Sequence, residues 1–160
     1  MFSKILIANR GEIAVRIQKT ARRMGIRTVQ VFSEADADSL AVELADETVF
    51  IGAAAASESY LVQDKIVDAV RRTGAEAVHP GFGFLSENPV FARRLEAEGI
   101  AFIGPNPHAI EAMGDKITSK KLAAAAGVST VPGHMGLIAD ADEAPMYDDL
   151  TLDAADFESY

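Results

Sequence analysis

The stretch HPGFGFLSEN, residues 79–88, gathers backbone and side chains that could bind a ligand. Gly81 and Gly83 permit positive φ angles and a close approach of the backbone to a bound group. Ser86 or Asn88 can cap a helix that starts at the proline after them, because proline is favoured at the first helical position. A loop of this kind could present its N–H groups to an anion.

The spacing Gly81-x-Gly83-x-x-Ser86 is a degenerate form of the dinucleotide-binding fingerprint. That fingerprint belongs to the first turn between a strand and a helix, and here the first such turn, residues 9–12, has only one glycine. The pattern favours an ordinary glycine turn followed by a capped helix. It leaves a nucleotide-binding loop as the weaker alternative.

Metal and nucleophile chemistry have little support in the sequence. There is no cysteine, and the three histidines are far apart without an HExxH motif. His79 is expected to end a strand and to hydrogen-bond to its own loop. No GxSxG elbow supports a serine hydrolase, and no GxxxxGK[ST] motif supports a P-loop.

Two groups of basic residues could contact an anionic or acidic partner, and a solvated helix face is the simpler interpretation of both. The two groups are Arg10, Arg16, Lys19, Arg22 and Arg23 near the start of the chain, and Lys116, Lys120 and Lys121 farther on.

The net charge of −9 is unevenly distributed. Residues 139–160 contain eight acidic residues and no Lys or Arg, so the rest of the chain is nearly neutral. A neutral domain without a basic, aromatic stripe argues against nucleic-acid binding. The sequence has neither a signal-peptide pattern nor a run of roughly 18 apolar residues, so we expect a cytoplasmic protein that does not enter a membrane.

Short apolar runs alternate with amphipathic segments, which is typical of βαβ units. We expect an α/β fold, a doubly wound parallel sheet with helices on both faces. The expected strands are 4–9, 28–33, 47–52, 75–79 and 100–105. The expected helices are 10–25, 39–45, 61–74, 89–99, 106–114 and 115–127.

The loop at 79–88 then leaves the carboxyl end of the fourth strand, where open parallel sheets bind their ligands. We expect the α/β domain to cover residues 1–104 and a helical connector to cover residues 105–144. The acidic tail, residues 145–160, has no periodic pattern and is expected to be disordered.

Several long motifs resemble the amino-terminal part of biotin carboxylase, and among these proteins the subunits of acyl-CoA carboxylases of the propionyl-CoA type. They are ILIANRGEIAVRI (5–17), SEADADSLAVELADETVFIG (33–52), AVHPGFGFLSEN (77–88), FIGPNPHAIEAMGDKITSKKLA (102–123) and AGVSTVPG (126–133). The resemblance extends from Met1 to about Ala144. The remaining residues match no part of that family, so we expect a truncated carboxylase.

The resemblance implies an ATP-grasp ligase that activates bicarbonate with MgATP and carboxylates biotin. It implies that Lys116 contacts ATP and that Phe82, Gly83 and Glu87 lie on a loop facing the biotin and phosphate site. Phe82 stands where the family often has tyrosine. Arg16 matches a position at the family's homodimer interface.

The partners that the resemblance implies are the biotin carboxyl carrier and carboxyltransferase subunits of an acyl-CoA carboxylase. We assign no catalytic residue and no metal ligand, and we expect the chain alone to be inactive. A second hypothesis is a non-enzymatic module that dimerises with full-length carboxylase subunits. A third is a free-standing nucleotide-binding domain that depends on Lys116.

Overall fold

Five short, mostly apolar segments pair into one parallel sheet, as the strand pattern predicts. The computed structural model describes residues 1–130 of the chain. The strands are β1 (Lys4–Ile7), β2 (Arg27–Ser33), β3 (Glu47–Gly52), β4 (Ala77–His79) and β5 (Ala101–Phe102). Their order in the sheet is β3-β2-β1-β4-β5, and every neighbouring pair is parallel. The expected fold class is confirmed.

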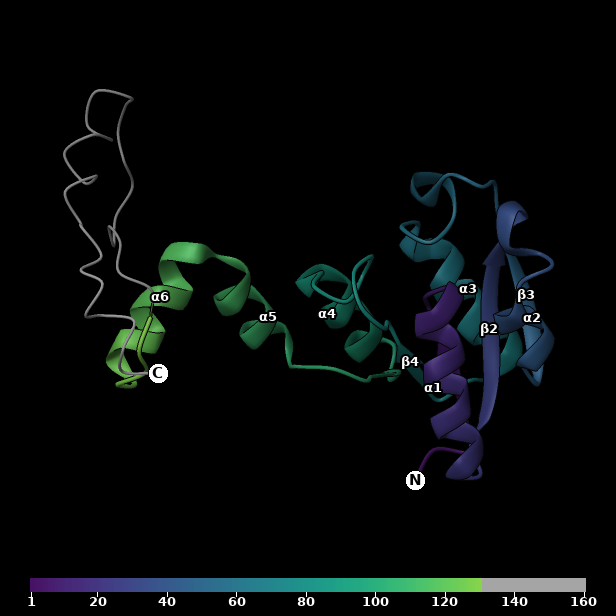
Figure 1. Cartoon of the computed structure of the whole chain (residues 1–160), viewed down its shortest axis with the longest axis horizontal. Helices are drawn as coiled ribbons and strands as arrows, with labels where there is room; N and C mark the ends of the chain where they lie inside the picture. The colour runs from purple at the N-terminus through teal and green to yellow at the C-terminus, as the bar shows by residue number, and fades with distance from the viewer. Residues whose placement is uncertain (131–160) are drawn as a thin grey trace, which may run out of the picture. The chain divides into compact units, whose positions relative to one another are not determined.

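Helices connect and follow these strands (Figure 1). They are α1 (Gly11–Arg23), α2 (Leu40–Leu44), α3 (Gln63–Thr73), α4 (Pro89–Ala97), α5 (Pro107–Gly114) and α6 (Lys116–Ala125), with two 3-10 turns, η1 (Glu34–Asp36) and η2 (Ala56–Glu58). Each helix expected from the sequence is present, with ends that differ by a few residues. The two 3-10 turns were not expected, and both lie in loops at the carboxyl ends of strands.

Successive residues of the central strand β1 point to opposite faces of the sheet. Leu6 packs in a cluster with residues of α3 and α4, whereas Ile5 and Ile7 pack against α1 and, for Ile7, α2. The chain moves from β1 towards one edge through α1 and α2, and returns to build the other half through α3 and α4. Since parallel connections are right-handed, the two halves place their helices on opposite faces.

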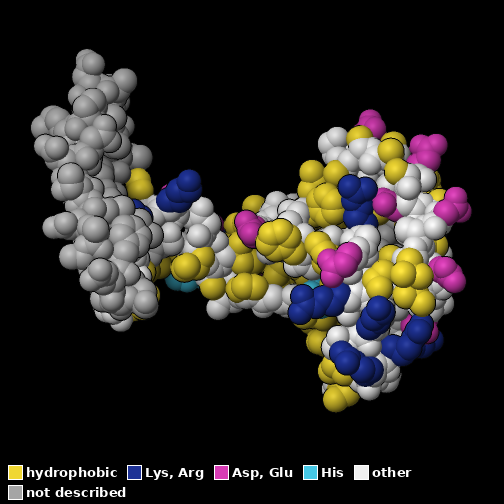
Figure 2. Space-filling model, in the orientation of Figure 1, with side chains coloured by type: hydrophobic (Ala, Val, Ile, Leu, Met, Phe, Trp, Pro, Cys, Tyr) yellow, Lys and Arg dark blue, Asp and Glu magenta, His cyan; other side chains and the backbone are white. Residues whose placement is uncertain are grey.

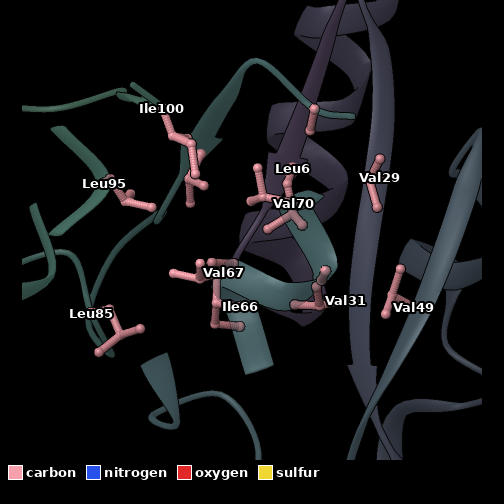
Figure 3. Packing of buried hydrophobic residues seen from close by; sticks show 14 of the residues in the cluster. Leu6, Val29, Val31, Val49, Ile66, Val67, Val70, Leu85, Leu95 and Ile100 are labelled. Atoms are coloured by element: carbon pink, nitrogen blue, oxygen red, sulfur yellow. The ribbon is translucent and has the colours of Figure 1, made fainter. Parts of the chain in front are cut away.

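The larger core lies between the sheet and the α3–α4 side (Figure 3). Val29, Val31 and Val49 from the strands point towards Ile66 and Val70 of α3. β-branched side chains suit these buried strands because they pack well on a pleated surface. Residues of the loop after β4 also join this core, so the loop is anchored to the sheet's interior.

A compact unit covers Met1–Glu111, and a second begins at Ala112. The expected domain edge near residue 104 stays a prediction. The predicted acidic tail belongs to residues 131–160, and these residues lie outside the described part of the chain. Within residues 1–130, each helix is too short or too polar to cross a membrane.

Candidate functional site

The sheet has one switch point, between β1 and β4, where the direction in which successive strands are added to the sheet reverses. The loops after β1 and β4 leave their strands towards helices on opposite faces, so a crevice opens between them. A hollow of about 630 Å³ lies there. Its lining residues are Asn9, Arg10, Gly11, Glu12, Ile13, Asp36, Phe82, Gly83 and Phe84. We call this hollow the crevice.

Asn9 joins the two loops that form the crevice. It follows β1 and is only 2% exposed. Its Nδ2 donates to the carbonyl oxygens of Pro80 at 2.7 Å and Phe82 at 2.9 Å, and its Oδ1 accepts from the N–H of Arg10 at 2.9 Å. A buried side chain that satisfies three backbone groups fixes both loops with respect to each other.

The loop after β4 turns sharply by using left-handed backbone. Gly81 has a φ of 69° and Gly83 a φ of 70°, while Phe84 adopts a φ of 48°. Only Asn88 of the two expected caps is used, and its Oδ1 accepts from the N–H of Phe91 at 2.9 Å. The structure is therefore a glycine turn leading into a capped helix, as the preferred interpretation of the spacing predicted.

His79 also stabilises this turn. Its Nδ1 accepts a hydrogen bond from the N–H of Gly81 at 3.1 Å, so the expected bond from the strand-end histidine to its own loop is confirmed. Burial lowers the pKa of His79, because a charged imidazolium loses hydration there. The neutral ring is the form that can accept this bond.

Asp36 is the centre of a polar cluster beside the crevice. Its Oδ2 accepts from the hydroxyls of Ser33 at 2.7 Å and Tyr60 at 2.8 Å, and its Oδ1 lies 3.4 Å from Nη1 of Arg10. Burial by itself would raise the pKa of Asp36, but the bonds from Ser33 and Tyr60 and the Arg10 charge outweigh it and lower the pKa. Burial and the bond to Asp36 raise the pKa of Tyr60 to about 12.

A second hollow of about 590 Å³, which we call the groove, lies between α1 and the strand ends. It is mainly apolar. Its lining residues are Phe2, Ile5, Glu12, Ile13, Arg16, Ile17, Thr20, Ala21, Met24, Ile26, His79, Gly81, Phe82 and Ile103. Beside it, Lys and Arg side chains gather over α1, where Arg16, Lys19, Arg22 and Arg23 line a shallow surface (Figure 2).

The structure brings some of the expected site residues together. Phe82 is 76% exposed and lines both hollows, Gly83 lines the crevice, and exposed Arg16 lines the groove. Glu87 is exposed and lines neither of these two hollows. Lys116 is the exposed first residue of α6 and belongs to the second unit.

Sequence reasoning did not single out Asn9, Asp36 or Tyr60 as site residues. Asn9 carried a signal, because it is a polar residue at the carboxyl end of the first expected strand, where a parallel sheet has its switch point. The other two lie in loops without periodicity. Their roles depend on which loops the fold brings together.

The crevice can bind an anion or the polar edge of a ligand. It opens at the amino end of α1, a helix of 13 residues whose N-cap residue Arg10 makes no side-chain capping bond. Free N–H groups and the helix dipole favour negative charge there. Across residues 1–130, no three His, Asp or Glu side chains gather closely enough to hold a metal ion.

Comparison with protein families gives a match over most of the described chain. Residues 1–110 match the family described as biotin carboxylase, N-terminal domain. The propionyl-CoA carboxylase alpha chain of Ruegeria pomeroyi is 67% identical over 144 residues, which is 90% of this chain and 21% of that protein. The mitochondrial alpha chain of Rattus norvegicus is 61% identical over 143 residues, 89% of this chain and 19% of that protein.

Solved structures show the same fold. A biotin carboxylase complex with beta-gamma-ATP from Campylobacter jejuni has a TM-score of 0.88 and 42% identity, covering 93% of this chain and 33% of that one. The biotin carboxylase domain dimer of Hydrogenobacter thermophilus 2-oxoglutarate carboxylase, with MgADP and bicarbonate, has a TM-score of 0.84 and 46% identity, covering 91% and 32%. The chain spans about a fifth of the length of its curated relatives.

Proposed function

The chain belongs to the biotin carboxylase N-terminal domain family, and from that premise we propose that it serves the ATP-dependent carboxylation of biotin within an acyl-CoA carboxylase. The observation that carries the proposal is the 67% identity to a propionyl-CoA carboxylase alpha chain over 144 residues. Its proposed partners are a second biotin carboxylase subunit, a biotin carboxyl carrier and a carboxyltransferase. Its proposed compartment is the cytoplasm.

We propose Lys116 as the residue that binds the phosphates of ATP. Asp115 caps α6 by accepting from the N–H of Thr118 at 2.6 Å, which leaves the exposed Lys116 side chain at the first turn of the helix. An ammonium group in that position suits a polyphosphate, because it neutralises charge on the oxygens. Bound MgATP would supply the phosphoryl group that activates bicarbonate.

We propose that the loop of Phe82, Gly83 and Glu87 faces the biotin and phosphate end of the site. The ring of Phe82 offers an apolar surface, and Gly83 has open space where a side chain would stand. That combination lets a bicyclic ligand approach the backbone. Phenylalanine has no hydroxyl, so its contribution is contact and exclusion of water.

The isolated chain is proposed to be inactive. In phosphoryl transfer the rate comes largely from preorganised phosphate and metal contacts, and residues 1–130 contain no group of three or more His, Asp or Glu side chains that could hold a metal ion. The purified 160-residue chain should show no bicarbonate- and biotin-dependent ATP hydrolysis. Detectable hydrolysis above a Lys116→Ala control would contradict this proposal.

The role of Lys116 is tested in a grafted subunit, in which the 144-residue matching segment of the Ruegeria pomeroyi alpha chain is replaced by this chain's segment. Lys116→Ala should raise the KM for ATP by about tenfold or more, since one charged phosphate contact is lost. The matched control is Lys121→Ala on the same helix, which should leave that KM unchanged. Equal effects of both variants would remove the proposed role.

A non-enzymatic interaction module remains a second candidate, because the open groove places exposed Phe82 and Met24 on an apolar surface next to Arg16. Apolar patches of this kind are typical of protein interfaces. The chain would then co-purify with an intact carboxylase alpha chain, and Arg16→Glu would weaken the complex. A chain that stays monomeric in the presence of that subunit would exclude this candidate.

A further inference from the structure

The loop that carries Phe82 contains a phenylalanine in an unfavourable backbone conformation. Phe84 has a φ of 48°, and among residues 1–130 it is the only residue other than glycine with a positive φ. Left-handed backbone brings the Cβ of such a residue close to its own carbonyl oxygen, so a bulky residue adopts it only when its surroundings require it. Something outside the loop must hold Phe84 in place.

Tyr60 makes that contact. Its ring stacks on the ring of Phe84 with the centroids 5.1 Å apart and the planes 3° from parallel. Tyr60 follows η2, in the connection after β3, whereas Phe84 lies in the connection after β4. The stack therefore ties together two loops that belong to opposite halves of the sheet.

The hydroxyl of Tyr60 is fixed in turn. It donates to Oδ2 of Asp36 at 2.8 Å and accepts from the N–H of Ser33 at 3.2 Å. Asp36 also faces Arg10, which follows β1. A chain of contacts thus runs through the loops after β1, β2, β3 and β4, and its last member is the ring of Phe84.

We propose that Tyr60 is a positioning residue: its stack on Phe84, oriented by Asp36, holds the left-handed turn and so determines where Phe82 is presented. Tyr60 itself is 1% exposed and does not line the crevice. It would act on a ligand only through the loop. The part of this inference that concerns biotin rests on the proposed function, but the order of the loop can be measured without it.

The first test measures amide hydrogen exchange in the full 160-residue chain. The N–H of Gly81 bonds to His79 and that of Ser86 bonds to the carbonyl oxygen of Gly83, so both report on the turn. Tyr60→Leu should accelerate exchange at these two amides by about tenfold more than at the amides of β1. Tyr60→Phe keeps the stack and should have a smaller effect in the same direction.

The matched control is Leu95→Ala, because Leu95 is fully buried in the same core cluster on α4. It should accelerate exchange across the domain without singling out the turn. If Tyr60→Leu gives the same uniform pattern as this control, the proposal is overturned and Tyr60 is only a core residue. If Tyr60→Leu does not fold, Asp36→Asn and Tyr60→Phe provide the same comparison.

The second test uses the grafted subunit and separates positioning from general destabilisation. Tyr60→Phe should raise the KM for biotin several-fold, about 3 to 10 times, and leave the KM for ATP unchanged. An equal rise in the KM values for biotin and for ATP would contradict the positioning role of Tyr60. A grafted subunit that is inactive before any substitution would reject the proposed function, while the exchange experiment would still decide on the loop.

Discussion

The crevice and the groove share Phe82, yet polar contacts hold the crevice together, whereas apolar side chains form most of the groove. The crevice is fixed by Asn9 and by the cluster around Asp36, through hydrogen bonds of 2.7 to 3.4 Å that join four loops. The groove is lined mainly by aliphatic and aromatic side chains of α1, the strand ends and the amino terminus. Polar ties of this kind keep a site in one geometry before a ligand arrives, whereas an apolar surface is suited to being covered by a partner.

This difference predicts where substitutions will matter. Changes beneath the crevice should cost stability because they leave buried groups crowded or unsatisfied. Changes to exposed side chains on the groove should cost little stability and alter association instead. Four experiments compare the two regions, from the largest expected effect to the smallest.

Gly81→Ala should be the most damaging change, because Gly81 lines the groove but lies against Asn9, whose hydrogen bonds join the two loops of the crevice. A Cβ there would lie 2.7 Å from Nδ2 of Asn9 and 2.9 Å from Cγ2 of Ile13, in a backbone with φ of 69°. We expect a loss of about 2–4 kcal/mol in the free energy of unfolding, measured by urea denaturation. Gly83→Ala is the matched control: its φ is 70° but its Cβ would meet open space, so the loss should be about 1 kcal/mol. Equal losses would show that crowding against Asn9 is unimportant.

Asn9→Ala removes the bonds that join the loops after β1 and β4. It leaves the carbonyl oxygens of Pro80 and Phe82 without their buried donor, so we expect a loss of about 2–3 kcal/mol in urea denaturation. Asn106→Ala is a suitable control, because exposed Asn106 makes one bond, to the N–H of Ala109. Its loss should be about 1 kcal/mol or less. If the two variants are equally stable, Asn9 does not tie the loops together.

Alkaline titration tests the Tyr60–Asp36 bond. The folded protein holds the pKa of Tyr60 at about 12, above its value in an unfolded chain. Its contribution to stability is therefore complete below the unfolded pKa and disappears as the pH rises through the folded pKa. The loss should be on the order of 2 kcal/mol between about pH 10 and 12. Tyr60→Phe should flatten that part of the stability curve, and an unchanged curve would contradict the assignment.

Phe82→Ser should have the smallest effect on stability, because the ring is 76% exposed. We expect a change within about 0.5 kcal/mol in urea denaturation. The same variant should bind less of a dye that reports exposed apolar surface, since it removes a ring shared by both hollows. A large destabilisation would mean that Phe82 is part of the packing and is not a presented side chain.

The sequence predicted much of this architecture because its patterns are local. Apolar runs such as residues 4–7, the amphipathic α3 and the Asn88 cap each depend on residues close together in the chain. The glycine turn was predicted for the same reason. The contacts between loops were not predicted, because loops such as those of Tyr60 and Phe84 come together only through the sheet order β3-β2-β1-β4-β5. The periodicity of the sequence does not identify a residue whose contact partner depends on the order of the strands in the sheet.

Phe84 shows most clearly which features the sequence alone does not predict. A phenylalanine after a glycine gives no local reason to expect a φ of 48°, and the preference of the residue argues against it. The conformation follows from the ring of Tyr60 and from the anchoring of Leu85 in the core, both of which exist only in the folded domain. Site residues held in this manner have to be found in the structure.

The most direct test of the central claim is the rate of bicarbonate- and biotin-dependent ATP hydrolysis by the grafted subunit. If the chain is a biotin carboxylase domain with a preorganised crevice, the grafted subunit should hydrolyse ATP within about tenfold of the unaltered Ruegeria pomeroyi subunit. Gly81→Ala in the same graft should abolish that activity or reduce it strongly. A folded graft that binds ATP but shows no dependence on biotin would contradict the account.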